Sequence, residues 1–450
     1  MKTISPGKFK YPVFFFFLFT FFFMKCERST SPLLPAGLHL SAEYVAVTEA
    51  DLRLQTDKLP ENAALEIRRG DSLIFRGALQ TADTTVTDTA LLPAHDYTYQ
   101  ATLFKNGKPA AYSQPLQITT MDTTSHDFTW EITEFPSPYG SGELRDVCIV
   151  NENNIWAVGE IYSDSVQSWL PYNAVHWDGQ QWELKRIYFP TICGQSSLTP
   201  YPSKTIFSFN NGEIWISSSG DKIAILKNGN QISNFCLPTS VSMSINKIWG
   251  TSGNDLYVVG SSGLIAHYDG AQWHRIESPE GAGGTDLPVQ DIWGSKNEKT
   301  GEYEILCVAS RLDQNKGREL LRINNQSVEK LQTEGLSWSL KAIWFIPGVI
   351  YYIGGDGLYP SRNLADRWHR IPSPFLYKHA IRGQAVNDVI VAGSFGLLSH
   401  FNGASWRHYN GGHFPSTGAA YRGVAIHNNI IAAVGYYNLR NGFVVVGRRN

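Results

Sequence analysis

The sequence has few charged residues, few cysteines and no catalytic motif with a fixed spacing. Charged residues make up 17% of the 450 residues, and the formal net charge is -2. Nucleic-acid binding needs basic patches that neutralise phosphates, so this composition argues against that class. The five cysteines include no pair with the C-x-x-C spacing of a structural zinc site. No P-loop, H-E-x-x-H or Ser-His-Asp pattern is present, so the sequence indicates no metal, no cofactor and no catalytic residue.

The N-terminus has the layout of a signal peptide. Lys2, Lys8 and Lys10 are followed by an apolar run over residues 11–24 that is mostly phenylalanine. A membrane span takes about 20 apolar residues, so the run is short for a permanent anchor. Loss of residues 1–25 would remove four lysines and no acidic residue, taking the net charge from -2 to -6. We therefore expect an exported, mildly acidic protein.

Cys26 comes directly after Met24-Lys25, at the end of the apolar run, and begins a stretch, residues 26–35, that would serve as a tether. This placement resembles a bacterial lipoprotein, whose first mature residue is a lipidated cysteine. The sequence departs from that pattern because Lys25 stands where a small residue is usual, and Phe23 and Met24 replace a leucine and a small residue. The resemblance implies lipid attachment at Cys26 and a location in the cell envelope, as an outer-membrane lipoprotein facing the periplasm or the cell surface. Plain secretion and an uncleaved anchor are the alternatives.

The other four cysteines fall into two classes. Cys148 and Cys307 lie inside apolar strand patterns, DVCIV and EILCVA, where a buried thiol acts as a small hydrophobic side chain. Cys193 and Cys236 lie near the ends of two successive repeats, so a disulfide between them is geometrically possible. Spacing alone does not fix the distance between their Cα atoms, and the pairing stays open.

Residues 36–122 form a block of seven short alternating strands, which predicts a β-sandwich. The segment LLPAHDYTYQATLFKNGKPA resembles the fibronectin type III pattern: Leu92, Pro93 and Tyr97 match its tyrosine-corner region, and Asn106-Gly107 would form the last hairpin. The resemblance implies a spacer or adhesive module, and no titratable cluster in the block suggests chemistry.

From about residue 140 the chain repeats a four-strand unit, clearest over residues 245–279. The strands INKIWG, DLYVVG, LIAHY and WHRIESP are separated by turn residues. Asp269-Gly270 predicts a two-residue hairpin turn in which glycine supplies a positive φ. The tryptophan after this turn is expected to cover the hydrophobic edge of its sheet.

The second strand of the unit occurs seven times, at residues 153–159, 212–218, 254–260, 303–309, 348–354, 387–393 and 428–435. The last unit stops at Asn450 with three strands, and residues 128–136 resemble a fourth strand without a unit of its own. Pairing of that segment into the last unit would close a ring and remove the exposed sheet edges. Residues 127–450 thus resemble secreted seven-bladed β-propellers with D-I-W-G…VG…DG-x-x-W repeats. The sialidase Asp box, the WD dipeptide and the kelch glycine pair are not periodic, so no activity is transferred from those families. The predicted fold is all-β, a fibronectin type III-like sandwich followed by this propeller.

The first strands of the units should line the central channel. Aligned by their distance to the second strand, they share an apolar column: Val147, Ile206, Ile248, Ile292, Ile343, Ile381 and Val424. Two positions earlier lies a column in which every member is polar: Arg145, Lys204, Asn246, Gln290, Lys341, His379 and Arg422. If these side chains converge, they form an electropositive ring suited to a carboxylate, a phosphate or a sulfated glycan. A solvated channel mouth that merely permits polar residues is the alternative.

Two aromatic sets recur at fixed positions. Trp249, Trp293 and Trp344 follow the apolar column; exposed, they would favour carbohydrate stacking, but we expect them to be packed between sheets. His176, His267 and His400 precede the hairpin turns, and we expect structural hydrogen bonds rather than metal binding, because the repeat spreads them around the ring.

Carboxylates also recur: Asp146 and Asp291 share a first-strand column, and Glu213, Asp255 and Asp388 share a turn position. Equivalent positions in separate units usually lie farther apart than the roughly 5 to 10 Å a glycosidase needs. Turn aspartates are expected to bond their own backbone.

Three hypotheses for function follow. The first is an exported, lipid-anchored monomer that acts as a binding or scaffold module for a glycan or a protein partner. The alternative is a carbohydrate-active enzyme, glycosidase-like or glycosyltransferase-like, that uses the channel mouth. A third possibility is a structural part of an envelope complex, which would require a large apolar patch on one face.

Overall fold

The computed structural model describes residues 37–450 except 277–284, 312–316, 325–326, 373–375 and 413. The predicted signal peptide, Cys26 and the whole of the tether, residues 26–35, lie outside these residues. The described chain consists of β-strands and two short 3-10 helices, η1 (Thr239–Val241) and η2 (Ser261–Gly263). None of its helices is long and apolar enough to cross a membrane. The prediction of an all-β protein is confirmed.

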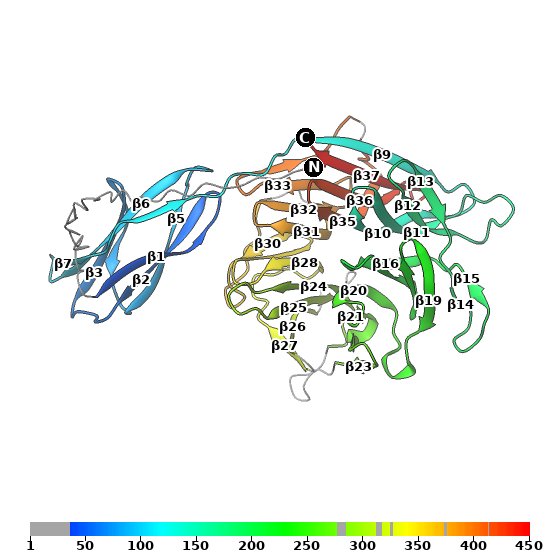
Figure 1. Ribbon diagram of the computed structural model, residues 1–450, viewed down its shortest axis with the longest axis horizontal. Coiled ribbons are helices and arrows are strands. Elements are labelled where there is room, and N and C mark those ends of the chain that lie inside the picture. Colours follow the sequence, from blue (N-terminus) through cyan, green and yellow to red (C-terminus); the bar gives the residue numbers. More distant parts are fainter. Residues whose placement is uncertain (1–36, 277–284, 312–316, 325–326, 373–375, 413) are drawn as a thin grey trace, which may run out of the picture. The chain divides into compact units, whose positions relative to one another are not determined.

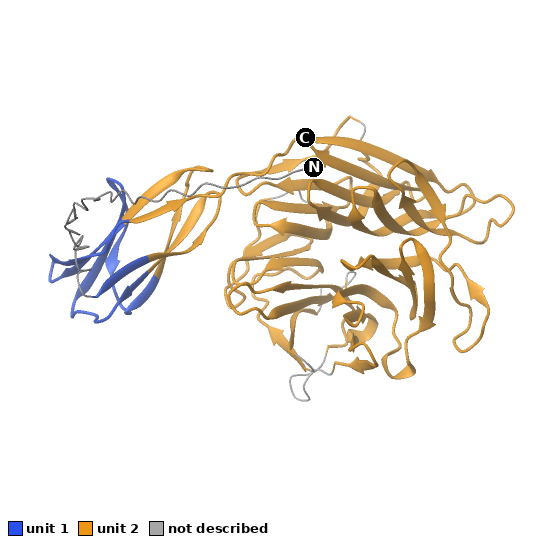
Figure 2. Ribbon diagram, viewed as in Figure 1, with its two compact units in different colours: residues 1–40, 54–84, 100–115 blue, residues 41–53, 85–99, 116–450 orange. Residues whose placement is uncertain are grey.

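Contacts between Cα atoms divide the chain into two compact units, coloured separately in Figure 2. The first consists of residues 1–40, 54–84 and 100–115, and the second of residues 41–53, 85–99 and 116–450. The division runs through the segment 36–122.

The strands of the segment 36–122 form two sheets, ordered β1-β2-β5 and β4-β3-β6-β7, with β8 pairing with β6. They are β1 (Leu38–Val45), β2 (Glu49–Thr56), β3 (Ala63–Arg69), β4 (Ser72–Ala78), β5 (Asp83–Thr89), β6 (Asp96–Lys105), β7 (Lys108–Tyr112) and β8 (Leu116–Thr119). Apolar residues alternate along β2, where Ala50, Leu52 and Leu54 are fully buried, as the period of a half-buried strand requires. The backbone N–H of Leu92 donates to the Tyr97 hydroxyl at 2.8 Å, in the segment that resembles the tyrosine-corner region.

Seven further sheets follow along the described chain, six of four strands and one of three. The first three are β10 (Gly142–Asn151), β11 (Asn154–Ile161), β12 (Tyr172–Trp177), β13 (Trp182–Lys185); β16 (Ser203–Ser208), β17 (Glu213–Ser218), β18 (Lys222–Lys227), β19 (Asn230–Cys236); and β20 (Ile245–Ser252), β21 (Asp255–Gly260), β22 (Ile265–Tyr268), β23 (Trp273–Arg275). A small hairpin, β14 (Phe189–Pro190) and β15 (Leu198–Thr199), lies between the first two sheets in the chain.

The fourth to sixth sheets are β24 (Val289–Lys296), β25 (Tyr303–Ser310), β26 (Arg318–Asn324), β27 (Ser327–Leu331); β28 (Leu340–Ile346), β29 (Ile350–Gly355), β30 (Leu358–Ser361); and β31 (Lys378–Ala385), β32 (Asp388–Gly393), β33 (Leu398–Phe401), β34 (Trp406–His408). The seventh contains β35 (Ala419–His427), β36 (Ile430–Tyr437), β37 (Asn441–Arg449) and β9 (Phe128–Pro136). Figure 1 shows β9, in cyan, alongside β37, in red, with which it pairs antiparallel as the sequence predicted.

The first strands of the seven sheets contact one another in succession, β10 to β16, β20, β24, β28, β31 and β35, and β35 contacts β10. An apolar cluster fills each junction between consecutive sheets. The junction of the seventh sheet with the first is filled as well, by Val434 and Val444 against Leu144 and Ile155. Each sheet therefore buries its faces against two neighbours, which a lone four-stranded meander cannot do.

The hairpin turns differ from the sequence prediction in length. Tyr268 pairs with Trp273, so the turn at Asp269-Gly270 spans four residues rather than two. The Asp269 carboxylate accepts the backbone N–H groups of Ala271 and Gln272, both at 2.8 Å, which holds the longer turn closed. Gly270 has a φ of 91°, as predicted for this position.

Candidate functional site

The polar column of the first strands converges on one cavity of about 230 Å³. All seven of its members line this cavity: Arg145, Lys204, Asn246, Gln290, Lys341, His379 and Arg422. Each is also the one residue skipped by a register shift between the first and second strands of its sheet. A β-bulge of this kind re-aims the side chain of the extra residue, so seven equivalent bulges direct seven polar side chains to the same place.

Cations outnumber carboxylates around this cavity, which we call the cationic cavity. Its lining includes six lysines and arginines but only three carboxylates. The cations are Arg145, Lys204, Lys247, Lys341, Arg382 and Arg422, and the carboxylates are Glu143, Asp146 and Asp291. Glu143 accepts a hydrogen bond from Arg145 at 3.1 Å and another from Arg422 at 2.8 Å. Asp146 and Asp291 are paired with Lys247 and Arg382.

Lys204 and Lys341 are the two cations of this lining that make no ion pair among the described residues. The Lys204 ammonium donates to Asn246 Oδ1 at 2.7 Å, and the Lys341 ammonium donates to Gln290 Oε1 at 3.0 Å. The two amide NH₂ groups donate to backbone carbonyls, those of Val289 and Ser310, both at 2.8 Å. These bonds turn the amide oxygens toward the lysines. The neutral members of the column therefore orient the ammonium groups without neutralising them.

The surroundings of these groups disfavour positive charge. Burial lowers the pKa of Lys341 to about 8, with smaller contributions from the charges of Lys204, Arg422 and Lys247 and against the opposing effect of Asp291. Burial and the charge of Arg145 also lower the pKa of Lys204. The pKa of His379 falls to about 3 through burial and the charges of Arg422 and Lys341, so its imidazole is neutral at physiological pH. An anion in the cationic cavity would relieve this repulsion.

Two ion pairs cross the channel between sheets that are not neighbours. Lys247 of the third sheet donates to both carboxylate oxygens of Asp146 in the first, each at 2.7 Å. Arg382 of the sixth sheet forms a bidentate pair with Asp291 of the fourth, with both bonds at 3.0 Å. Burial alone would raise the pKa of Asp291, but the charge and hydrogen bonds of Arg382 hold it below its ordinary value. We call these four residues the septum.

A second cavity, of about 410 Å³, shares Asp146, Lys247 and Arg382 with the cationic cavity, so the septum lies between the two. Its walls include five of the seven residues of the apolar column and several positions that follow it, among them the partly exposed rings of Phe207 and Trp293. We call it the aromatic cavity. The sequence did not predict it.

The three recurring tryptophans do not share one environment. Trp249 and Trp344 are buried, at 4% and 2% exposure, as predicted. Each lies against a glycine of the next first strand: a Cβ on Gly294 would meet the Trp249 ring at 2.3 Å, and one on Gly383 would meet the Trp344 ring at 2.6 Å. Trp293 packs against the apolar clusters of the neighbouring junctions, but it stays partly exposed and lines the aromatic cavity, so the prediction holds for it only in part.

The physical reason for this difference is one side chain in the following strand. Where Trp249 and Trp344 meet a glycine, the strand after Trp293 has Phe345, whose side chain is fully buried. The space that accepts the other two indoles is thus already filled. The Arg382 guanidinium lies 4.9 Å from the ring centroid of Trp293, a cation–π contact that holds the indole at the edge of the channel.

The recurring histidines make the predicted structural hydrogen bonds. Nε2 of His176, His267 and His400 lies 2.7 to 3.0 Å from a side-chain oxygen of Asn154, Asp255 and Asp388, respectively. The turn carboxylates were expected to bond their own backbone, and this expectation is wrong. Glu213 accepts from the indole of Trp215, two residues along the same strand, at 2.6 Å. The two aspartates bond histidines of the next strand, which are close enough to compete with the backbone of the turn.

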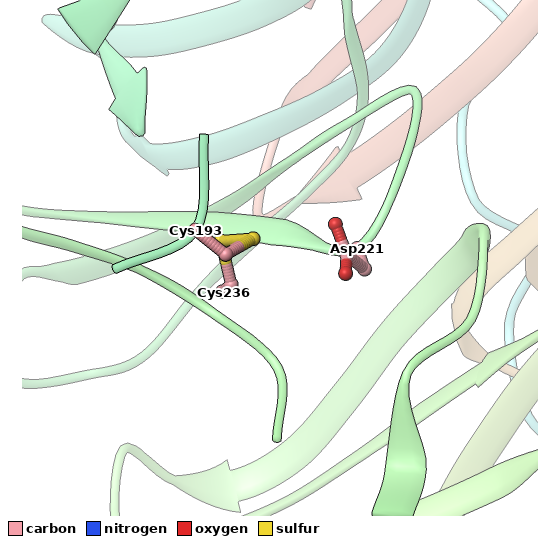
Figure 3. A group of neighbouring side chains, drawn as sticks. All are labelled: Cys193, Asp221 and Cys236. Carbon is pink, nitrogen blue, oxygen red and sulfur yellow. A yellow bond between two sulfur atoms is a disulfide. The ribbon is translucent and has the colours of Figure 1, made fainter. Parts of the chain in front are cut away.

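The cysteines in the described chain are not available for metal chemistry. Cys193 and Cys236 form a disulfide, which ties the connection between β14 and β15 to the end of β19. Asp221 lies beside this disulfide (Figure 3), but both sulfur atoms are bonded to each other. Cys148 and Cys307 are buried free thiols, as predicted, and burial raises the pKa of Cys148 to about 12.

The septum cations were missed by the sequence reasoning. Lys247 and Arg382 flank the apolar column on opposite sides, and Arg382 occupies the position where three other units have tryptophan. This replacement of tryptophan by arginine was the signal in the sequence that could have revealed Arg382. Their aspartate partners were noted only as separate carboxylates.

No family model matches the chain, and no curated protein matches its sequence. Among solved structures, it is similar to YCF48 bound to D1 peptide, with 15% identity and a TM-score of 0.51 over 73% of this chain and 98% of that one. It is also similar to YCF48 from Cyanidioschyzon merolae, with 16% identity and a TM-score of 0.49 over 71% and 98%. The WD40 β-propeller domain of Doa1 gives 10% identity and a TM-score of 0.49 over 71% and 97%. At these identities the likeness concerns the fold alone, which is a β-propeller.

Proposed function

We propose that this chain is an exported binding protein whose seven-bladed propeller receives a carboxylate of a protein partner in the cationic cavity. One observation carries the proposal. Seven bulged side chains line a single cavity in which six cations face three carboxylates, and two of those cations lack an ion-pair partner among the described residues. A carboxylate would supply the missing charge, with charge-assisted hydrogen bonds from two ammonium groups.

The architecture in this proposal rests on repeated features. Seven sheets with seven apolar junctions, and β9 paired into the last of them, support a seven-bladed closed ring. The bond between Leu92 and Tyr97 supports a fibronectin type III-like sandwich in the preceding segment. Such a sandwich would hold the propeller away from its anchor.

A carboxylate on a protein fits the cationic cavity better than a glycan does. No Phe, Tyr or Trp side chain lines this cavity among the described residues, so the stacking surface on which sugar rings usually rest is missing there. The cavity of about 230 Å³ is also small for a ligand that must enter whole, but it can admit one side chain or chain end. The similar propeller YCF48 is described as bound to a peptide, which is a precedent for the fold only.

The alternative of a glycosidase-like enzyme has less support. Asp146 and Asp291 are the carboxylates of the channel that could have acted as a pair. Asp146 accepts two bonds from Lys247, one from the Thr205 hydroxyl at 2.6 Å and one from the Ile206 N–H at 3.0 Å. A general acid needs a raised pKa, whereas the pKa of Asp291 is lowered.

Export and lipid attachment at Cys26 complete the proposal and rest on the N-terminal sequence. Radiolabelled palmitate should be incorporated by the wild-type chain and not by Cys26→Ser. Incorporation that persists in the variant would exclude Cys26 as the attachment site.

An array of peptides with and without acidic residues, and with free or amidated C-termini, tests the binding proposal. We expect acidic or free-carboxylate peptides to bind, and Lys204→Gln/Lys341→Gln to weaken that binding at least tenfold. Lys227→Gln/Lys296→Gln is the matched control, since both lysines are exposed on strands of the same ring. Equal binding of acidic and neutral peptides, or binding that persists in Lys204→Gln/Lys341→Gln, would overturn the proposal. Uronate glycans on a parallel array would bind in place of peptides if the partner is a sugar acid.

A further inference from the structure

We propose that the aromatic cavity is a second ligand site, independent of the first, and that it takes a small aromatic compound with a carboxylate or carbonyl oxygen. Its volume of about 410 Å³ lies within the range of small-molecule sites, which are mostly apolar with a few placed polar groups. The class of ligand follows from the walls and the floor of the cavity.

The walls favour a planar apolar body. They are formed by apolar side chains of the first strands, including Ile248, Ile292 and Val424, and by aromatic rings that include the partly exposed Phe207 and Trp293. Aromatic rings attract other rings in offset or edge-to-face geometries, which adds to the gain from burying apolar surface. Trp293 is available for this contact because Phe345 occupies the space into which the equivalent indoles are packed.

The floor is the septum, and it offers donors rather than acceptors. Lys247 has three N–H groups and donates two of them to Asp146. The Arg382 Nε–H has no acceptor among the described residues, while its NH1 and NH2 groups bond Asp291 and backbone carbonyls. The oxygens of Asp146 already accept four hydrogen bonds. A ligand that reaches the floor must therefore bring an acceptor.

This site does not depend on the proposed function. Lys204 and Lys341 line the cationic cavity and not the aromatic cavity, whereas Trp293 and Ala425 line the aromatic cavity and not the cationic one. Variants in one set should leave binding in the other cavity unchanged.

Saturation-transfer NMR and calorimetry on the full chain test the site with phenylacetate as the probe. Acetate, which lacks the ring, and benzylamine, which lacks an acceptor, are the comparison compounds. We expect phenylacetate to bind at least tenfold more tightly than either, with saturation transferred to its ring protons. No binding of phenylacetate at millimolar concentration, or equal binding of acetate, would overturn the proposal.

Variants locate the probe. Ala425→Phe should fill the cavity and abolish phenylacetate binding, and Trp293→Leu should weaken it tenfold or more, while Trp293→Phe keeps most of it. Val150→Phe, at another partly exposed position of the lining, replaces Ala425→Phe if that variant fails to fold. Lys204→Gln/Lys341→Gln should have no effect. Undiminished binding in the filled cavity, or loss in the lysine variant, would contradict the assignment.

Discussion

The two cavities of the channel are built on the same seven strands, yet they differ in chemistry. The cationic cavity is lined by bulged residues two positions before the apolar column, and the aromatic cavity by that column and the residues after it. At the first, a backbone irregularity repeated in every sheet directs the side chains. At the second, the presence of Phe345 in place of a glycine decides which tryptophan faces the channel. A bulge repeated in every sheet thus directs the side chains of the first site, whereas side-chain packing places the exposed indole of the second, and the septum lies between them.

The septum should be the most sensitive point of this arrangement. Asp291→Asn keeps the shape of the side chain but leaves the Arg382 guanidinium, 11% exposed, without its counter-charge. Removing one partner of a buried ion pair costs about 3–5 kcal/mol, which urea denaturation would measure as a loss of unfolding free energy. Asp291→Leu/Arg382→Met, which removes both charges, should recover most of that loss. A cost below about 1 kcal/mol for Asp291→Asn would show that the pair does not hold the septum.

The packing of the buried tryptophans can be disrupted by adding one methyl group. Gly294→Ala would place a Cβ at 2.3 Å from the Trp249 ring, and such overpacking costs about 1–3 kcal/mol. Gly220→Ala is the matched control, because the nearest atom to its added Cβ is a serine hydroxyl at 3.8 Å. We therefore expect Gly294→Ala to have a lower melting temperature than Gly220→Ala. Equal melting temperatures would mean that the indole is not held against the glycine.

At the cationic cavity we expect a smaller effect on folding stability, and one that depends on pH. The folded-state pKa of Lys341, about 8, lies below the ordinary value of 10.5, so the unfolded chain binds more protons between these two pH values. Stability contributed by this site therefore rises as the pH increases from 8 to 10.5, and below pH 8 the penalty is constant. Lys341→Met should lack this rise.

The measurement is the unfolding free energy of wild type and Lys341→Met at pH 7 and pH 10. The difference between the two proteins should change by about 1 kcal/mol over that interval, allowing for partial solvent screening. An unchanged difference would indicate that Lys341 titrates as it does in water.

Much of the cationic cavity could be predicted from the sequence, because its residues stand at a constant distance from the second strand of each repeat. The convergence of Arg145 and Lys341 follows from the repeat alone. The charge balance of the cavity does not, since its carboxylates come from outside the column: Glu143 lies two residues before Arg145, and Asp291 pairs with Arg382 of another sheet. The exposure of Trp293 depends on the residue at one position of the next repeat. The sequence shows that this residue is Phe345 and not glycine, but only the structure shows that the other two indoles pack on a glycine at this position. Cross-channel contacts such as Lys247 with Asp146 have no local pattern to reveal them.

The unbalanced positive charge of the cationic cavity can be measured at the ammonium group of Lys341. With lysines labelled by ¹³C-methylation, NMR can follow the titration of Lys341, identified by its absence from the spectrum of Lys341→Met. We expect a pKa near 8 in the free protein and a rise toward 10.5 when citrate, a tricarboxylate, is added, because a bound anion stabilises the ammonium form. A Lys341 pKa near 10.5 without citrate, or one that citrate does not move, would contradict an anion-binding role for the cavity.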